Sequence, residues 1–479
     1  MSEDRISRRT FLKGLGTSAL AFGFSTFLRR QSAFAQDPSI NFLTIQDPFF
    51  FSYEELLSEF EEETGIQVKL QGRSTDEIHA ELVNSFVAEQ KGLDVVGIDQ
   101  MWLSQYAENK WIIPLDEYIK DDNDEFKPEE LVPEVIHSMN EWRGSIYSIP
   151  SCAYTMLSFY RKDLFEEAGL TPPPEQQEDW WTWDKHLEYV RELDKLEDVD
   201  GTVIVGASPV PIVHMYSQLQ ASKGARWFEQ FPESPWDFTP TINSAENREA
   251  LEAYKELYDH SPAESISYVW FDAGTAFSTQ DIGLYYWWTS YAYLMRRAGY
   301  MSDEKSPNFG KIDYGVIPHQ PEVDQLTSIG GFSFGIPRYS QSKNEAWEFI
   351  KWASSTETQK KMAVTEPQLF SDFYREPLYE DEELEELYPW LPVQREAFAK
   401  GNGKLVRPPI PIYTTLEGFY GSELNKVLAG NKSPEKALED TQKNFETTLK
   451  QNFYIPDYSG EDYNDTLENT EKLLQDLAS

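Results

Sequence analysis

From residue 39 onward, short apolar runs alternate with longer stretches in which apolar positions recur at a helical period. The pattern predicts strands over 39–47, 66–72 and 93–99, and helices over 53–65 and 74–92. Gly65 provides the stop of the first helix, and Ser74 or Thr75 the cap of the second. Strands and helices in strict alternation are typical of an α/β fold with a mainly parallel sheet.

The later part of the chain continues with mixed elements. The pattern predicts a hairpin, an extended segment, a strand and a helix over 143–170, a proline-led loop entering a helix over 172–196, and single helices over 345–363 and 433–453. A chain of this length exceeds one ordinary hydrophobic core, so two lobes are expected.

The segment 282–297, IGLYYWWTSYAYLMRR, carries six large aromatic residues between Tyr285 and Tyr293. A packed core, a membrane contact and a ligand-binding surface are the three interpretations. The uncharged run 282–295 is 14 residues long, whereas a membrane-spanning helix needs about 20. A strand buries alternate residues, so about half of the aromatics are expected in the core, with Trp287 and Trp288 facing opposite ways and one of them lining a cleft.

The N-terminus has the pattern of an export signal. Arg8 and Arg9 precede an uncharged run over 14–28, and Ala33-Phe34-Ala35 has the form of an A-x-A cleavage site. The paired arginines match a twin-arginine signal, so we expect export in the folded state and cleavage after Ala35.

The chain has a formal net charge of −40. Without residues 1–35, which hold six basic and two acidic residues, 36 basic and 80 acidic residues remain, a net of −44. Such a field repels phosphate backbones and argues against nucleic acid as a partner. The acids are spread along the whole chain, which favours a solvated acidic surface suited to a saline medium, where salt screens self-repulsion. Cys152 is the single cysteine, so no intrachain disulfide can form.

Motifs for catalysis are missing from the sequence. It contains no P-loop, no G-x-G-x-x-G, G-x-S-x-G or H-E-x-x-H motif, and its six histidines lack metal-ligand spacing. We therefore expect no enzyme, no cofactor and no metal site. Two alternatives stay open: a secreted carbohydrate-active enzyme, because carboxylates are too abundant to exclude an acid/base pair, and a structural or adhesive surface protein.

Several blocks follow one another in a characteristic order, among them FEEETGIQVKLQ, LDVVGIDQMWLSQYAENKWIIPLDEYI, GSIYSIPSCAYTMLSFYRKDLFEEAGL, AFSTQDIGLYYWW and GGFSFGIPRYSQSKNEAWEFIKWASSTETQKKMA. In this order they resemble the extracellular solute-binding proteins of sugar ABC transporters (family 1), which include maltose-binding protein. The resemblance covers nearly all of residues 37–453 and departs from the family at 172–183 and 365–379.

The resemblance implies a two-lobe α/β fold of the periplasmic-binding-protein type (type II), with the ligand in a cleft between the lobes. Lobe 1 would comprise residues 36–150 and 317–362, and lobe 2 residues 151–316 and 363–479. It also implies an exported, monomeric, non-enzymatic receptor that passes a carbohydrate or sugar-like compatible solute (an oligosaccharide, glycoside or polyol) to the membrane permease subunits of an ABC importer.

Candidate ligand-binding residues follow from strand ends and from family positions. In open α/β sheets, ligands lie at the carboxyl ends of strands, where carboxylates can accept bonds from sugar hydroxyls and aromatic rings can cover sugar faces. The candidates are Gln46, Asp47, Asp99, Trp102, Tyr154, Trp287, Trp288, Gly331, Phe332 and Tyr413.

Some of these candidates have structural alternatives. Gln46 and Asp47 could form a turn or a helix cap, and Trp102 and Tyr154 could be core residues. Gly331 would let the backbone approach a ligand closely. His214 is a weaker candidate, for which a structural role is favoured.

Overall fold

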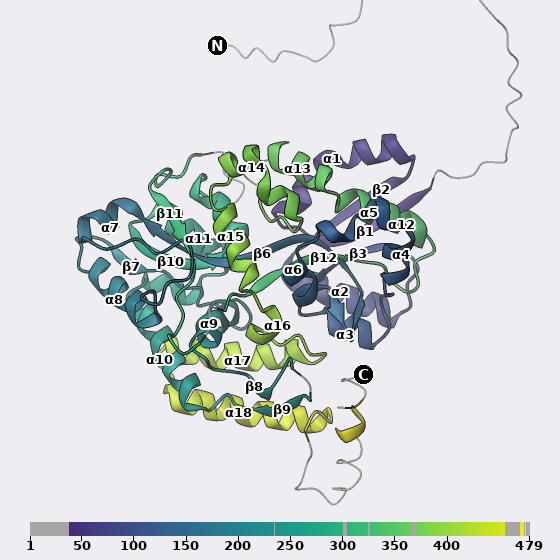
Figure 1. Ribbon diagram of the computed structural model, residues 1–479. Coiled ribbons are helices and arrows are strands. Elements are labelled where there is room, and N and C mark those ends of the chain that lie inside the picture. Colours follow the sequence, from purple (N-terminus) through teal and green to yellow (C-terminus); the bar gives the residue numbers. More distant parts are fainter. Residues whose placement is uncertain are drawn as a thin grey trace, which may run out of the picture. The chain divides into compact units, whose positions relative to one another are not determined.

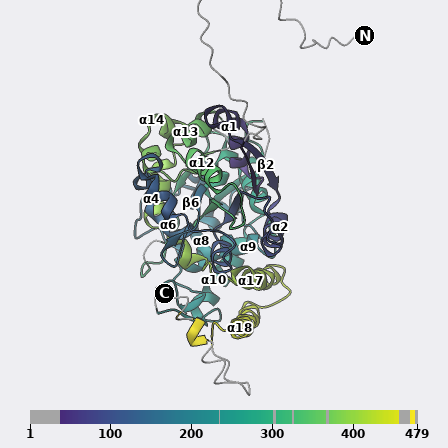
Figure 2. The ribbon, with the colours of Figure 1, turned by 90° about the vertical axis from the view of Figure 1, so that its right-hand side faces the viewer.

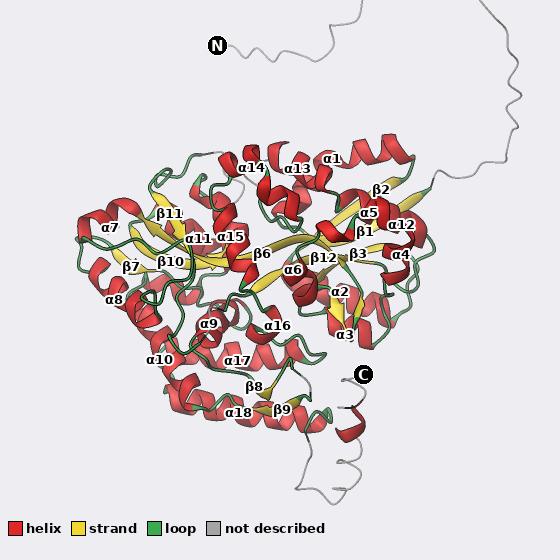
Figure 3. Ribbon diagram, in the orientation of Figure 1, coloured by secondary structure: helices red, strands yellow, loops and turns green. Residues whose placement is uncertain are grey.

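The computed structural model describes residues 38–233, 235–299, 304–323, 326–365, 370–455, 470–473 and 475. Its main sheet has the strand order β2-β1-β3-β12-β6-β10-β7, with β11 paired to β6 (Figure 1). Helices flank the strands on both faces (Figure 3). The predicted export signal, residues 1–35, lies outside the described residues.

Twelve strands and eighteen α-helices are defined within the described ranges. The strands are β1 (Ser39–Ile45), β2 (Gln67–Arg73), β3 (Val95–Asp99), β4 (Glu141–Trp142), β5 (Ser145–Ile146), β6 (Ile149–Arg161), β7 (Asp200–Thr202), β8 (Phe228–Gln230), β9 (Asp237–Pro240), β10 (Ile282–Trp288), β11 (Ile312–Gly315) and β12 (Ile329–Gly335). The helices are α1 (Pro48–Thr64), α2 (Thr75–Val87), α3 (Leu103–Glu108), α4 (Asp116–Asp121), α5 (Asn123–Phe126), α6 (Pro133–Met139), α7 (Lys162–Ala168), α8 (Trp183–Leu193), α9 (Pro211–Ser222), α10 (Ala245–Asp259), α11 (Trp270–Thr279), α12 (Lys343–Ala353), α13 (Thr356–Thr365), α14 (Glu382–Leu387), α15 (Leu391–Ala399), α16 (Gly403–Val406), α17 (Tyr413–Leu428) and α18 (Pro434–Gln451).

The N-terminal elements confirm the predicted alternation. β1 pairs in parallel with β2 and with β3, and α1 and α2 connect these strands. Phe60 of α1 is fully buried, and Gly65 ends the helix with φ +74°, its N–H donating to the Glu61 carbonyl at 2.9 Å. β1 and β3 therefore bring their carboxyl ends to the same edge of the sheet.

β6 joins two halves of the sheet. Its first residues, Ile149–Thr155, pair with β12, and its last, Met156–Arg161, pair with β10 and β11, all antiparallel. We call β2, β1, β3 and β12 the first half, and β10, β7 and β11 the second half. In the register, Trp288 lies opposite Met156, two residues beyond Tyr154.

Two predictions need correction. The sheet is mixed rather than mainly parallel, because β12, β6 and the β10–β6 pair run antiparallel, while parallel pairing is confined to β1–β2, β1–β3 and β7–β10. The single helix predicted over 345–363 is two helices, α12 and α13. The break falls at Ser354 and Ser355, and the Ser355 hydroxyl accepts a hydrogen bond from the Thr358 N–H at 3.1 Å, as expected of a residue that starts a new helix.

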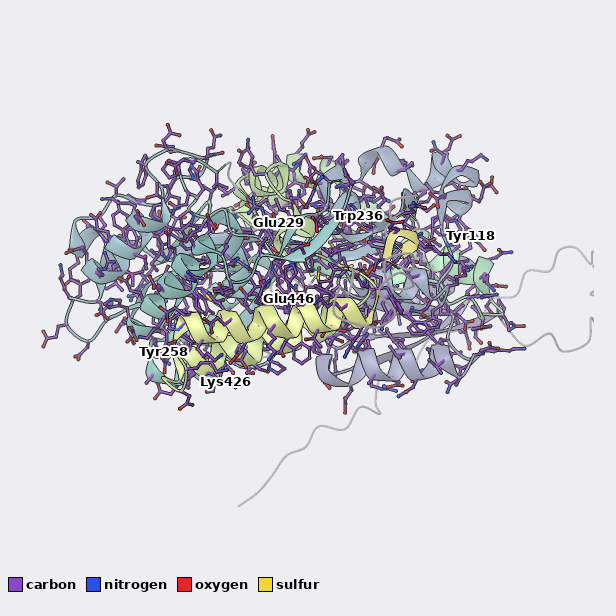
Figure 4. The ribbon with its side chains drawn as sticks, turned by 90° about the horizontal axis from the view of Figure 1, so that it is seen from below. Tyr118, Glu229, Trp236, Tyr258, Lys426 and Glu446 are labelled. Atoms are coloured by element: carbon purple, nitrogen blue, oxygen red, sulfur yellow. The ribbon has the colours of Figure 1, made fainter. Side chains whose placement is uncertain are left out.

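The helices α9, α10, α17 and α18 contact one another and form a layer that lies below the sheet in the view of Figure 1 (Figures 1 and 2). Every residue of α9 is buried, because α10, α16 and α17 contact it. α18 starts after Ser433, whose hydroxyl accepts from the Lys436 N–H at 3.3 Å, as the Ser-Pro pattern predicted. Figure 4 shows α18, with Glu446, across the near side of the ribbon.

In the ranges that the structure describes, none of the helices combines the length and the apolarity needed to span a bilayer.

Candidate functional site

A cavity of about 50 Å³ lies where the two halves of the sheet meet. The first half and its helices contribute Ile45, Asp47, Thr75, Asp99 and Phe332, and β6 contributes Tyr154. The second half and its helices contribute His214, Trp270, Phe271, Trp288 and Tyr291. Residues of both halves are needed to form the cavity, and its two carboxylates, Asp47 and Asp99, lie at the carboxyl ends of β1 and β3, as ligand sites in α/β sheets do.

Asp47 occupies the N-cap position of α1 without capping it. Its backbone is extended (φ −107°, ψ 171°), and Pro48 follows at the first helical position. The Asp47 carbonyl accepts from the Phe50 N–H at 2.9 Å, while the side chain makes no capping bond. The carboxylate is 8% exposed, has no polar partner among the described residues and faces the cavity. Burial raises its pKa to about 7.

Asp99 ends β3 and is held by the turn that follows. Its Oδ1 accepts from the Met101 N–H at 2.8 Å. Burial raises the pKa of Asp99, although the charge of Arg407 and the Met101 N–H oppose the shift. The second strand-end carboxylate is thus fixed in position by backbone geometry and faces the same cavity as Asp47.

Asp372 lies behind Asp47 and outside the cavity wall. It is 5% exposed, and its Oδ1 has no hydrogen-bond partner among the described residues. Its carbonyl accepts from the Ala153 N–H of β6 at 3.0 Å, which fixes its segment against the sheet. Burial and the charge of Asp47 raise the pKa of Asp372 well above its usual range.

A buried ion pair, Arg407–Glu417, lies beside His214 of the cavity wall. Arg407 donates to Glu417 Oε1 at 2.9 Å and to the Tyr413 hydroxyl at 2.9 Å, and that hydroxyl donates to Glu417 at 2.8 Å. His214 connects the group to the cavity, because its Nε2 lies 3.8 Å from Glu417 Oε1. Burial and Arg407 lower the pKa of His214 well below its usual value, so the imidazole is neutral.

Aromatic side chains make up much of the cavity wall. Trp288 meets Tyr154 edge-to-face at 5.2 Å between ring centroids and His214 at 6.1 Å. The Trp270 indole N–H donates to His214 Nδ1 at 3.4 Å, which leaves the imidazole proton on Nε2. Carboxylates and aromatic rings, which this wall combines, are the two kinds of group that a sugar or polyol requires.

Five of the ten candidate residues line this cavity: Asp47, Asp99, Tyr154, Trp288 and Phe332. His214, the weaker candidate, also lines it. The other five candidates, Gln46, Trp102, Trp287, Gly331 and Tyr413, are absent from its wall.

Each of the five absent residues has another place in the fold. The Gln46 N–H extends the pairing with β2 by donating to the Arg73 carbonyl at 2.8 Å. Trp102 stacks on His79 at 4.8 Å. A Cβ built at Gly331, where φ is +146°, would lie 2.2 Å from the Cys152 carbonyl oxygen, so this glycine accommodates β6.

Trp287 and Tyr413 are packing residues. Trp287 is fully buried and stacks on Tyr291 at 6.2 Å, with the ring planes 17° apart. Tyr413 takes part in the Arg407–Glu417 group. Of the two adjacent tryptophans, Trp288 is the one on the cavity wall, as their predicted opposite orientation allows.

The sequence reasoning missed Ile45, Thr75, Trp270, Phe271 and Tyr291. Tyr291 belongs to the aromatic segment, and Thr75 was considered only as a helix cap. Trp270 and Phe271 open α11, and an aromatic pair four residues before the block AFSTQD was the available signal.

A larger cavity of about 200 Å³ lies elsewhere, lined by residues that include Trp142, Arg143 and Trp236. Several of its polar groups are already paired: the Trp142 indole donates to Glu108 at 2.5 Å, Arg143 Nε lies 2.6 Å from the same carboxylate, and the Trp236 indole donates to the Pro232 carbonyl. We therefore place the candidate site at Asp47 and Trp288. Within the described ranges, no group of three or more His, Cys, Asp or Glu side chains is arranged to hold a metal ion.

Comparison with known proteins agrees with this geometry. Residues 51–360 match the family "Bacterial extracellular solute-binding protein". A crystal structure from Agrobacterium radiobacter K84 in complex with ribitol superposes with a TM-score of 0.75 at 26% identity, covering 86% of this chain and 98% of that one. One from Agrobacterium vitis S4 with bound D-mannitol has a TM-score of 0.75 at 21% identity, covering 87% and 99%.

Among relatives by sequence, the erythritol/L-threitol-binding protein of Mycolicibacterium smegmatis is 22% identical over 365 residues, 72% of each chain. The chain belongs to the bacterial extracellular solute-binding proteins, which bind solutes and are not enzymes. Its mixed α/β fold is that of the periplasmic sugar-binding proteins (type II). The alternative of a carbohydrate-active enzyme is thereby set aside.

Proposed function

We propose that this protein is the receptor of an ABC importer for a polyol or a carbohydrate of similar size, and that the cavity at Asp47, Asp99 and Trp288 holds the ligand. The observation that carries the proposal is the presence of strand-end carboxylates and aromatic side chains in the wall of one cavity. Relatives that carry ribitol, D-mannitol or erythritol in their names support this ligand class.

The size of the cavity favours a small ligand. A volume of 50 Å³ has room for about three to five water molecules, at about 10–15 Å³ for each. An open-chain polyol or a single sugar ring fits that scale better than an oligosaccharide. Hydroxyls would donate to Asp47 and Asp99, and the C–H surface would rest on Trp288 and Tyr154.

A ligand held between two lobes would favour their closure, which would be the protein's response to binding. We assign residues 36–150 and 317–362 to lobe 1 and residues 151–316 and 363–479 to lobe 2. Asp47 and Asp99 belong to lobe 1, and Trp288 and His214 to lobe 2. Ligand favours a closed state only through contacts that exist there and are missing from the open one, and a cavity shared between lobes supplies such contacts.

The remaining assignments follow from the sequence. Export through the twin-arginine route and cleavage after Ala35 fit a receptor that works outside the membrane, as a monomer that docks on permease subunits. The net charge of −44 on the cleaved chain favours a saline medium.

Calorimetry tests the proposal. Residues 36–479 are titrated with polyols, monosaccharides, oligosaccharides, peptides and divalent metals. We expect one-to-one binding of a polyol or monosaccharide and weaker or no binding of oligosaccharides. Tight binding of a peptide or a metal, with no response to any sugar or polyol, would reject it.

A further inference from the structure

The charges around the cavity do not balance. Asp47 and Asp99 line it, and Asp372 and Glu417 lie next to them and act on them electrostatically. Against these four buried acids, the described residues place one buried group that stays positively charged, Arg407. His79 also acts on Asp99, but burial lowers the pKa of His79 and of the cavity residue His214. Arg407 is already bonded to Glu417 at 2.9 Å, so its charge compensates Asp99 only in part. Asp47 and Asp372 have no cationic partner in the described part of the chain.

Asp47 is the cavity residue that lacks a positively charged partner among the described residues. Its carboxylate is more than nine-tenths buried, makes no bond to the helix that it precedes, and points into the cavity. Burying an unpaired carboxylate is costly, and a partner that offers both hydrogen bonds and positive charge removes that cost. Neutral hydroxyls supply the hydrogen bonds alone.

The walls also suit a cation. Trp270, Trp288, Tyr154 and Tyr291 line the same cavity. An aromatic face attracts a cation electrostatically, and the attraction grows when water is excluded, as in the aromatic cages that hold ammonium ligands. The carboxylates and the aromatic rings of this wall therefore favour the same charge.

We propose that the ligand of this cavity carries an ammonium group on a polyol or sugar skeleton, with the ammonium at Asp47 and the hydroxyls at Asp99 and Thr75. This inference rests on the proposed function, because it specifies the solute that the receptor binds. The skeleton supplies hydroxyls for the strand-end carboxylate, and the ammonium supplies the charge that the protein lacks.

Matched ligand pairs test the charge directly. Ribitol is compared with 1-amino-1-deoxyribitol, and mannitol with 1-amino-1-deoxymannitol, by calorimetry on residues 36–479 at pH 8. The amine of at least one pair should bind about tenfold more tightly or better than its neutral partner, the scale of one desolvated cation–π contact. Equal or tighter binding of both neutral polyols would overturn the inference and leave the proposed function standing. No binding of either pair or of the wider sugar panel would reject the proposed function itself.

A charge-removing variant locates the effect. Asp47→Asn keeps the shape of the side chain and should abolish the preference for the amine, because it should lower the affinity for the amine about tenfold more than the affinity for the neutral polyol. Asp99→Asn should weaken both members of a pair. The matched control is Asp94→Asn, because Asp94 is buried outside the cavity and bonded to Asn41 and Ser340. Retention of the full amine preference in Asp47→Asn would overturn the assignment.

Discussion

Gly330 on β12 leaves the space into which the Trp288 ring fits. A Cβ built at Gly330 would lie 3.0 Å from Trp288 Cη2 and 3.1 Å from Tyr154 Cε2. These distances are shorter than ordinary contacts between carbon atoms, so a side chain here would push the indole away from its place. A glycine on the first half of the sheet thereby sets the position of a tryptophan from the second half.

Gly330→Ala should weaken ligand binding by about 1 kcal/mol or more, because the indole must move by a few tenths of an ångström or tilt. Calorimetry with the polyol that binds best measures the change. Gly418→Ala on α17 is the control, since a Cβ there meets no atom within 4 Å. Full affinity in Gly330→Ala would show that the indole position does not matter for binding.

Trp288 and Trp287 offer a matched pair of buried indoles. Trp288→Ala should weaken binding by about 1–3 kcal/mol, the scale of a lost aromatic face, and Trp287→Ala should leave affinity nearly unchanged. Both rings are at most 2% exposed, so both variants should also lose about 3–5 kcal/mol of stability.

Trp288→Phe retains an aromatic ring and is the variant to measure if Trp288→Ala does not fold. Affinity and denaturant unfolding, measured on the same preparations, separate the two effects. An equal loss of affinity in the two alanine variants, in proportion to their loss of stability, would mean that Trp288 acts only as core.

The ionisation of Asp47 should make stability fall as pH rises. Burial raises its pKa from 3.8 in the unfolded chain to about 7 in the folded protein. The folded state therefore holds more protons between these values, and stability declines across that window. Above pH 7 the charged carboxylate costs on the order of 4 kcal/mol, from about three pKa units at 1.36 kcal/mol each.

Asp47→Asn should consequently raise the free energy of unfolding at pH 8, and change it little at pH 4, where Asp47 is neutral in the folded state and only partly ionised in the unfolded state. Asp372, whose pKa burial also raises, still contributes a decline of the same sign in both proteins. Asp94→Asn is expected to lower stability at pH 8 by about 1–3 kcal/mol, because Asp94 accepts bonds from the Asn41 N–H and the Ser340 hydroxyl. Denaturant unfolding in a pH series measures all three proteins, and a destabilised Asp47→Asn at pH 8 would contradict the account.

Removing one member of the Arg407–Glu417 pair should lower the free energy of unfolding. Arg407→Met leaves the Glu417 carboxylate buried without its cation and should destabilise the protein by about 3–5 kcal/mol. Arg407→Met combined with Glu417→Gln removes both charges and should recover much of the loss. A double variant no more stable than Arg407→Met alone would show that the cost comes from packing rather than from charge.

The sequence predicted the strand-end carboxylates because topology decides their place. Asp47 and Asp99 follow strands of one sheet, and parallel strands bring their carboxyl ends together. The opposite orientation of Trp287 and Trp288 follows from the period of a strand. The same period could not show which one faces the cavity, because every residue of β10 is buried and neither face is marked by polar side chains.

The rest of the site depends on tertiary packing. Trp270 and Phe271 reach the cavity because α11 starts beside it, and His214 does so from a helix that is buried on all sides. Asp372 lies within residues 365–379, where the family resemblance fails, so no family position indicated it. The break between α12 and α13 was missed because Ser354 and Ser355 interrupt a helical period without a glycine or a proline.

A crystal structure of residues 36–479 grown with the tightest-binding polyol or amino-polyol tests the central claim most directly. The account predicts density for one ligand molecule between Asp47 and Trp288, with its polar groups within hydrogen-bond distance of Asp47 or Asp99. Density for the ligand at another place, with this cavity closed to it, would contradict the account.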